Sequence, residues 1–132
     1  MEPRISLITL GVSDLDRATV FYRDGLGLPT HGDAPGVTFF SLQGAWLALY
    51  PRENLAADAN VPTEGQGFCG ITLAHNVRSK EAVDGVLEQA KAAGATVTRP
   101  GHDTDWGGYA GYFTDLDGFL WEVAWNPFLD LT

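Results

Sequence analysis

The order of the predicted strands and helices limits the fold of this chain most, because the same order occurs twice. In the first half, a strand over 5–12 rich in β-branched residues precedes a helix near 14–25, and two further strands follow. In the second half, a strand over 68–77 precedes a helix near 79–93, and three short strands follow. One helix and one small sheet give too little core to be stable alone. The pattern therefore predicts an internal repeat of about 55 to 60 residues, whose two halves pair.

The segment RENLAADANVPTEGQG, residues 52–67, separates the two halves. It is polar, it contains a proline and two glycines, and its few apolar residues follow no strong period. We interpret it as a linker or mobile loop. We therefore expect one domain over residues 1–132, with a first module over about 1–55, a linker over about 56–66 and a second module over about 67–132.

The formal net charge of −9 argues against nucleic acid and against anionic membrane surfaces, because both attract basic proteins. A cationic ligand or partner would be favoured, although acidity is also a common route to solubility. The single cysteine, Cys69, excludes an internal disulfide and is expected to be a buried, inert thiol. No segment resembles a signal peptide or a membrane span, so we expect a cytoplasmic protein.

Successive side chains of a strand point to opposite faces, and this alternation predicts which face each strand turns to its helix. In the last predicted strand, Trp121 and Val123 take the helix side, so Glu122 must lie on the other face. That second face mixes small, polar and aromatic residues in each sheet, which is typical of a concave, partly hollow surface. We therefore expect Glu122 to point into a cleft, with neighbours among Thr9, Thr72, Tyr50 and Tyr112.

Three stretches of the sequence resemble the vicinal oxygen chelate superfamily, the group of glyoxalase I, bleomycin-resistance proteins and extradiol dioxygenases. They are LGVSDLDRATVFYRDGLGL near the start, AGA after the second helix, and DLDGFLWE near the end, where Leu116 stands at a position usually held by proline. The resemblance covers nearly the whole chain. It implies an α+β fold of two βαβββ modules that form an open barrel containing a cleft, and it implies a homodimer.

The resemblance also implies where a metal would be held. In metal-dependent members a glutamate at the position of Glu122 is one of three or four ligands, and the other positions fall on Leu7, Ala48 and Gly70. None of these three side chains can bind a metal, whereas zinc, iron or nickel needs three or more N, O or S ligands. The departure disfavours metal-dependent glyoxalase or dioxygenase activity. We therefore expect no metal and no cofactor, and whether the chain is an enzyme stays open.

Aromatic and polar residues on the predicted concave faces are the candidate ligand-binding residues. Aromatic residues at strand spacing are more often core, but here they share a face with glycines. Trp106 differs, because it lies in the loop GHDTDWGG, where it is either a ligand contact or lid, or a loop anchor or dimer contact. His102, Asp103 and Asp105 of the same loop match no closed metal site. The candidates are Thr9, Trp46, Tyr50, Phe68, Thr72, Trp106, Tyr112 and Glu122, with Glu122 also the tentative catalytic residue.

Three functions are compatible with these residues. The first is a metal-independent protein that binds a small aromatic or cationic molecule in its cleft. The second is a lyase, isomerase or epimerase of this superfamily, with Glu122 as general base or as the remaining metal ligand. The third is a structural or regulatory dimer without a small ligand, in which Glu122 is a relic that accepts hydrogen bonds.

Overall fold

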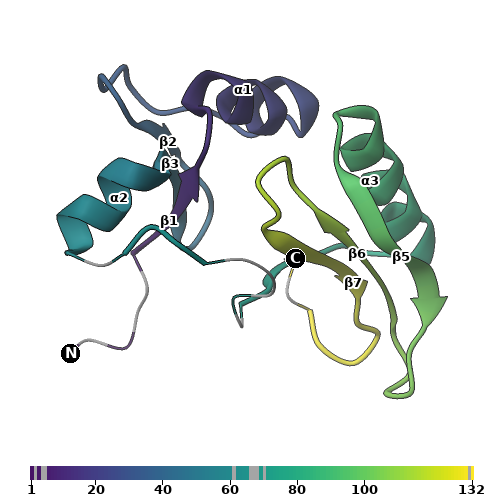
Figure 1. The fold of residues 1–132 in the computed structure, drawn as a ribbon. Helices are drawn as coiled ribbons and strands as arrows, with labels where there is room; N and C mark the ends of the chain where they lie inside the picture. The colour runs from purple at the N-terminus through teal and green to yellow at the C-terminus, as the bar shows by residue number, and fades with distance from the viewer. Residues whose placement is uncertain (2, 4–5, 61, 66–68, 70, 131) are drawn as a thin grey trace. The chain divides into compact units, whose positions relative to one another are not determined.

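The computed structural model describes residues 1, 3, 6–60, 62–65, 69, 71–130 and 132 (Figure 1). The chain divides into two compact units, Met1–Gly67 and Phe68–Thr132, and each is described by itself below. Each unit holds its own sheet, of three strands in the first and four in the second. The α+β fold expected from the sequence is confirmed.

The first unit contains a three-stranded sheet in the order β1-β3-β2. β1 is parallel to β3, and β2 is antiparallel to β3. Asp14 caps the first helix, and its carboxylate accepts a hydrogen bond from the backbone N–H of Arg17 at 2.9 Å. The elements are β1 (Leu7–Val12), α1 (Leu15–Val20), the π-helical turn η1 (Phe21–Gly25), β2 (Thr38–Phe40), β3 (Trp46–Pro51) and α2 (Arg52–Ala59).

The apolar face of this sheet packs against α1 and η1, as the alternation predicts. The Thr19 and Thr38 hydroxyls are hydrogen-bonded at 2.7 Å, and the rings of Tyr22 and Phe40 lie 6.0 Å apart. Both contacts join this helical segment to β2. Among the described residues of the unit, the buried hydrophobic ones are Leu10, Val12, Ala18, Phe21, Tyr22, Phe40, Leu47, Ala48, Leu49 and Ala56.

The interpretation of residues 52–67 as a linker or loop was wrong for its first half, because Arg52–Ala59 forms α2. This helix lies against Gly11 of β1, on the face opposite to α1, and Figure 1 shows the two helices on different sides of the strands. A Cβ atom at Gly11 would lie 3.2 Å from the Arg52 Cα and 3.3 Å from the Leu55 Cδ2. A side chain at this position would crowd the helix, and glycine avoids that contact. The helix therefore covers part of a face that the sequence predicted to be hollow.

The second unit has the complete βαβββ order. Its sheet runs β4-β7-β6-β5, with β4 parallel to β7 and the other pairs antiparallel. Ser79 caps the helix, since its hydroxyl accepts a hydrogen bond from the backbone N–H of Ala82 at 3.1 Å. The elements are β4 (Leu73–Asn76), α3 (Lys80–Ala92), β5 (Thr96–Asp103), β6 (Tyr109–Thr114) and β7 (Leu120–Trp125).

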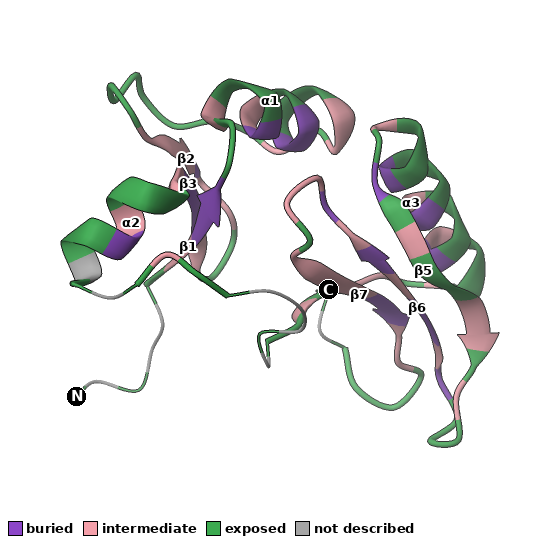
Figure 2. Ribbon diagram, in the orientation of Figure 1, coloured by how far each residue is buried: buried purple, intermediate pink, exposed green. Residues whose placement is uncertain are grey.

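The core of the second unit lies between α3 and the sheet, where Figure 2 shows the buried residues facing one another. Val83, Leu87 and Ala90 form the buried side of α3. Gly111 of β6 allows close contact, because a Cβ atom there would lie 2.5 Å from the Leu87 Cδ1. Val123 is fully buried on the same face of the sheet. The prediction that this face of β7 packs against the helix is confirmed.

The turn between β6 and β7 depends on Asp115, and Leu116 stands where the resemblance implies a proline. The Asp115 Oδ1 accepts hydrogen bonds from the backbone N–H groups of Asp117 at 2.9 Å and Phe119 at 2.8 Å. Gly118 supplies the left-handed backbone conformation that the turn needs, with φ +86°. Leu116 is therefore compatible with the hairpin of β6 and β7.

The start of the second unit differs from its prediction. The strand expected over 68–77 is β4, which begins at Leu73, and Phe68 and Gly70 lie outside the described residues. Cys69 is exposed, so the expectation of a buried thiol was wrong. The strand ladder begins four residues after Cys69, so the alternation that placed this side chain in the core does not apply to it. In the part of the chain that the structure describes, no helix is long and apolar enough to cross a bilayer.

The close contact at Gly111 generates a test of the core. Gly111→Ala adds a methyl group 2.5 Å from Leu87 and 3.0 Å from the backbone atoms Arg99 O and Gly101 N, so it should lower the free energy of unfolding. The expected loss is about 1–3 kcal/mol, the usual cost of overpacking. Gly85→Ala in α3 is the matched control, because nothing lies within 4 Å of the new methyl. It should stabilise the helix by about 0.5–1 kcal/mol. Urea unfolding measures both changes, and a Gly111→Ala protein as stable as the wild type would contradict this packing.

Candidate functional site

Glu122 lies near the middle of β7, on the face of the sheet opposite to α3. Its neighbours across the strand ladder are Tyr112 in β6 and Ala74 in β4. The Tyr112 hydroxyl donates a hydrogen bond to the Glu122 Oε1 at 2.9 Å. Of the four neighbours expected from the sequence, Tyr112 is therefore in contact with Glu122. Thr72 precedes β4, and Thr9 and Tyr50 belong to the other unit.

A hollow of about 240 Å³ lies on this face of the second unit. Tyr112 and Glu122 form one side of it, and residues of β5 and of the turn after β5 form the rest. Its lining residues are Arg99, His102, Asp103, Thr104, Asp105, Trp106, Ala110, Tyr112 and Glu122.

Two irregularities of β5 bring its polar side chains to the hollow. Arg99 pairs with Tyr112, and His102 pairs with Ala110, although residues three apart in a regular strand point to opposite faces. The register shifts between Val97 and Arg99 and again between Arg99 and His102. Each shift changes which face the following residues occupy. The sequence analysis did not select Arg99 as a site residue, because no local pattern shows a bulge.

The turn between β5 and β6 is held by its own hydrogen bonds. The backbone N–H of Thr104 donates to the Gly108 carbonyl, and that of Gly107 donates to the Thr104 carbonyl, both at 3.0 Å. The Gly108 N–H donates to the Thr104 hydroxyl at 3.0 Å. Trp106 lies at the tip of this turn and is 48% exposed. The turn thus fixes an exposed indole at the edge of the hollow.

The lining of the hollow carries more negative than positive groups, with three carboxylates and one guanidinium. Lys80, outside the hollow, forms an ion pair with Asp103 at 2.5 Å. Burial and, next, the hydrogen bond to Glu122 raise the pKa of the Tyr112 hydroxyl, while the nearby Arg99 guanidinium acts against this. Tyr112 therefore stays protonated at neutral pH and donates to the carboxylate. This environment favours a ligand that is positively charged or donates hydrogen bonds.

The two units can be compared at the positions where the resemblance implies metal ligands. Thr9 and Ala74 lie equally far before the helix caps Asp14 and Ser79, and they pair with Ala48 and Glu122 respectively. Ala48 is therefore the counterpart of Glu122.

By the same count, the counterpart of Leu7 is Thr72, two residues after the Gly70 named from the sequence. Leu7 and Ala48 carry no ligating atom. Among the described residues, no group of three or more His, Cys, Asp or Glu side chains is placed to hold a metal ion.

The predicted site residues of the first unit share one face of its sheet. Thr9 pairs with Ala48, and Tyr50 pairs with Gly11, where α2 covers the sheet. The ring of Trp46 contacts the ring of His31, with centroids 4.7 Å apart. Phe68 lies outside the described residues. The structure thus brings Trp106, Tyr112 and Glu122 together in the second unit, and Thr9, Trp46 and Tyr50 on one face of the first.

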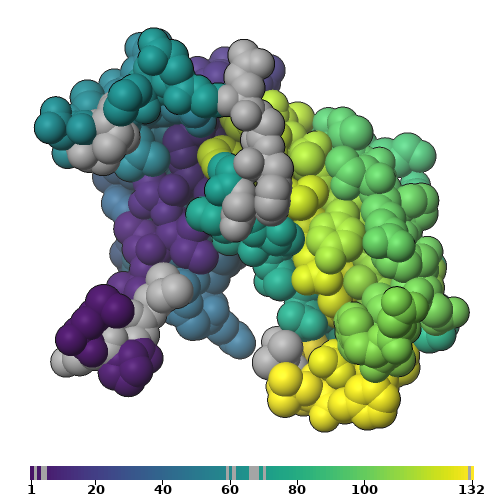
Figure 3. Space-filling model, turned by 60° about the horizontal axis from the view of Figure 1, so that its bottom comes forward, coloured from purple at the N-terminus to yellow at the C-terminus, as the bar shows by residue number. Residues whose placement is uncertain are grey.

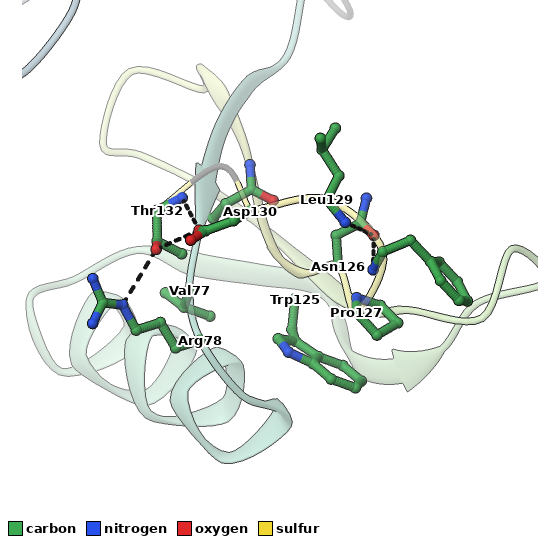
Figure 4. A pocket seen from close by; sticks show the side chains of 10 residues that line it. Val77, Arg78, Trp125, Asn126, Pro127, Leu129, Asp130 and Thr132 are labelled. Atoms are coloured by element: carbon green, nitrogen blue, oxygen red, sulfur yellow. Dashed lines mark hydrogen bonds between the residues drawn. The ribbon is translucent and has the colours of Figure 1, made fainter.

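A second hollow, of about 540 Å³, lies where the chain turns after β7 (Figure 4). The polar side chains that line it form hydrogen bonds within the turn. The Asn126 Oδ1 accepts from the backbone N–H groups of Phe128 and Leu129, at 2.9 and 3.2 Å. The Asp130 Oδ1 accepts from the Thr132 N–H at 3.0 Å and from its hydroxyl at 2.7 Å. These bonds organise a C-terminal segment that Figure 3 shows gathered at one end of its unit, so the Glu122 hollow remains the candidate site.

The sequence and the fold match one known group of proteins. A sequence profile of the Glyoxalase/Bleomycin resistance protein/Dioxygenase superfamily matches residues 4–123, and the chain belongs to this superfamily. A crystal structure of a glyoxalase-related enzyme from Fulvimarina pelagi is 34% identical, with a TM-score of 0.88 over 98% of this chain and 93% of that one.

Two further structures are similar over most of the chain. A lactoylglutathione lyase from Agrobacterium tumefaciens is 29% identical, with a TM-score of 0.72 over 96% of both chains. A glyoxalase/bleomycin resistance protein/dioxygenase from Nocardioides is 26% identical, with a TM-score of 0.78 over 95% of this chain and 84% of that one.

The hydrogen bond between Tyr112 and Glu122 can be tested by titration. The raised pKa means that the folded protein binds the phenolic proton more tightly than the unfolded chain. The resulting stability is present below the ordinary tyrosine pKa of 10.0 and is lost as the pH rises through the folded value. Glu122→Gln removes the charge, so the pKa of Tyr112 should fall but stay above its ordinary value because burial persists. Ultraviolet absorbance of tyrosinate reports the titration, and Tyr112→Phe identifies its step. An unchanged titration in Glu122→Gln would show that the carboxylate does not act on Tyr112.

Proposed function

We propose that this protein binds a small cationic or aromatic molecule at the Glu122 hollow without the help of a metal. The observation that carries the proposal is the carboxylate of Glu122, which accepts a hydrogen bond from the Tyr112 hydroxyl on the wall of a hollow whose lining carries three carboxylates and one guanidinium. An ammonium group of the ligand would form a charge-assisted hydrogen bond with Glu122. Trp106 would contact the apolar part of the ligand.

The metal-free part of the proposal rests on the paired strands of the two units. The counterpart of Glu122 is Ala48, and the position of Leu7 is apolar, so two of the expected ligand positions carry no donor atom. Zinc and iron sites need three or more protein ligands. The Tyr112 hydroxyl donates to one oxygen of the Glu122 carboxylate, and an ionised carboxylate can accept further hydrogen bonds from a ligand.

An enzymatic function is the second candidate, and it is favoured by the similarity to a glyoxalase-related enzyme and to a lactoylglutathione lyase. In that case the chain would be a lyase, isomerase or epimerase, and Glu122 would act as a general base or as the remaining metal ligand. A general base must reach the proton that it removes. Glu122 lines the hollow, so a substrate bound there would lie within its reach. The homodimer and the cytoplasmic location expected from the sequence stay predictions.

Removal of the Glu122 charge tests the binding proposal. Glu122→Gln keeps the shape of the side chain, so folding should be intact. The affinity for benzylamine, a small aromatic cation, should fall by about 1.5–3 kcal/mol, the scale of a hydrogen bond to a charged group. Isothermal titration calorimetry measures the change. Glu88→Gln is the matched control, because it removes the same charge from the exposed surface of α3. If benzylamine binds equally well to the wild type and to Glu122→Gln, the carboxylate is a relic.

The absence of a metal requirement gives a separate test. After dialysis against a chelator, the wild-type protein should keep its affinity for benzylamine and its midpoint of thermal unfolding. Elemental analysis accompanies the binding measurement. About one zinc, nickel, iron or manganese ion per chain, lost when Glu122 is changed to Ala, would overturn the alignment that places the other ligand positions at Leu7, Ala48 and Gly70, and would favour the enzymatic candidate.

A further inference from the structure

We infer that Trp106, seated on the backbone of Gly108, makes the Glu122 hollow selective for planar aromatic cations over aliphatic cations of the same size. This inference rests on the proposed function and names the ligand class of the same site. Glu122 would hold the cationic group, and the indole would hold the ring. Gly108 is then a positioning residue, which acts through Trp106.

The indole of Trp106 occupies the space where a side chain at Gly108 would lie. A Cβ atom at Gly108 would lie 1.9 Å from the Cζ3 and 2.0 Å from the Cη2 of Trp106. These distances are far shorter than any non-bonded contact, so the ring rests directly on the glycine backbone. The position of the indole therefore depends on the missing side chain of its neighbour.

The turn that carries the indole is stabilised by hydrogen bonds across its base and by a contact at Gly107. Thr104 and Gly108 are joined by backbone and side-chain hydrogen bonds at 3.0 Å. Gly107 has φ +93°, a conformation that favours glycine, and a Cβ atom there would lie 3.1 Å from the ring of Phe128. The ring of Phe128 thus packs against Gly107, and the ring of Trp106 packs against Gly108. The ring of Trp106 is held in place before any ligand binds, and an aromatic surface fixed in advance costs little conformational entropy on binding.

Trp106 differs from the other aromatic residues near this end of the sheet. The ammonium of Lys80 lies 5.6 Å from the centroid of the Tyr109 ring and 6.0 Å from that of Trp125, so those two rings already have a cation. Trp106 has no aromatic or cationic partner among the residues that the structure describes. It is 48% exposed and lines the hollow together with Glu122. An exposed indole beside a carboxylate suits a ligand that carries both a ring and a positive charge.

Two amines of equal charge and similar size test the inference. Benzylamine carries a flat aromatic ring, and cyclohexylmethylamine carries a puckered aliphatic ring on the same aminomethyl group. The wild-type protein should bind benzylamine roughly 3- to 10-fold more tightly, because stacking adds this much beyond area burial. In Trp106→Leu, which keeps an apolar side chain without a ring, the two affinities should become equal. Calorimetry measures both amines on each protein.

Gly108→Ala tests the positioning role without removing the indole. The new methyl would displace the ring, so the preference for benzylamine should be lost although Trp106 is still present. This methyl would also lie 2.7 Å from the carbonyl oxygen of Trp125, so thermal unfolding must accompany the measurement. Gly85→Ala, a glycine substitution in open space, is the matched control and should keep the preference. Trp106→Leu decides the question if Gly108→Ala does not fold.

The outcomes separate this inference from the proposed function. Glu122→Gln should weaken both amines by the same factor and leave the preference for benzylamine intact. If both amines bind and depend on Glu122, but the wild type shows no preference or Trp106→Leu keeps it, the inference alone is overturned. If neither amine binds to the wild type, the proposed function and the inference are overturned together.

Discussion

The close packing of α3 against β6 and β7 decides to which face of the sheet Tyr112 and Glu122 point. Leu87 approaches the sheet directly over Gly111, and Val123 is fully buried beside it. Because strand side chains alternate, a face fixed by this contact also fixes the opposite one. Tyr112 and Glu122 then meet on the other side of the sheet at 2.9 Å. Burial of such a polar pair in the core would cost free energy, and on this face of the sheet its remaining hydrogen-bonding groups can contact water or a ligand.

The sequence was sufficient for the parts of the fold that follow from local periodicity and alternation. Both main helices and the face of Glu122 could be predicted in this way. The helix α2 could not, because its contact with Gly11 is formed between segments distant in sequence and its own apolar residues show no period. Arg99 was missed for a related reason, since the register shifts of β5 arise from pairing with β6.

The comparison of the two units separates the scaffold from the chemistry. The parallel pairing of the first and last strands recurs in both units, as β1 with β3 and β4 with β7. The side chains at the corresponding centre of each sheet differ, with Ala48 in one unit and Glu122 in the other. Superfamily membership therefore describes the backbone of this chain well, whereas the reaction or ligand depends on a few side chains that the repeat does not preserve.

The parallel pairing also has a consequence for the order in which the chain can fold. β7 is the last strand of its unit in sequence, but it lies between β4 and β6 and pairs with both. During synthesis, β4 therefore has no neighbouring strand in its sheet until residues 120–125 have left the ribosome. The first unit meets the same condition earlier, when β3 is complete at Pro51. Each sheet is thus completed by its final strand: β5 and β6 can pair beforehand, but β4 joins the second sheet only once β7 is present.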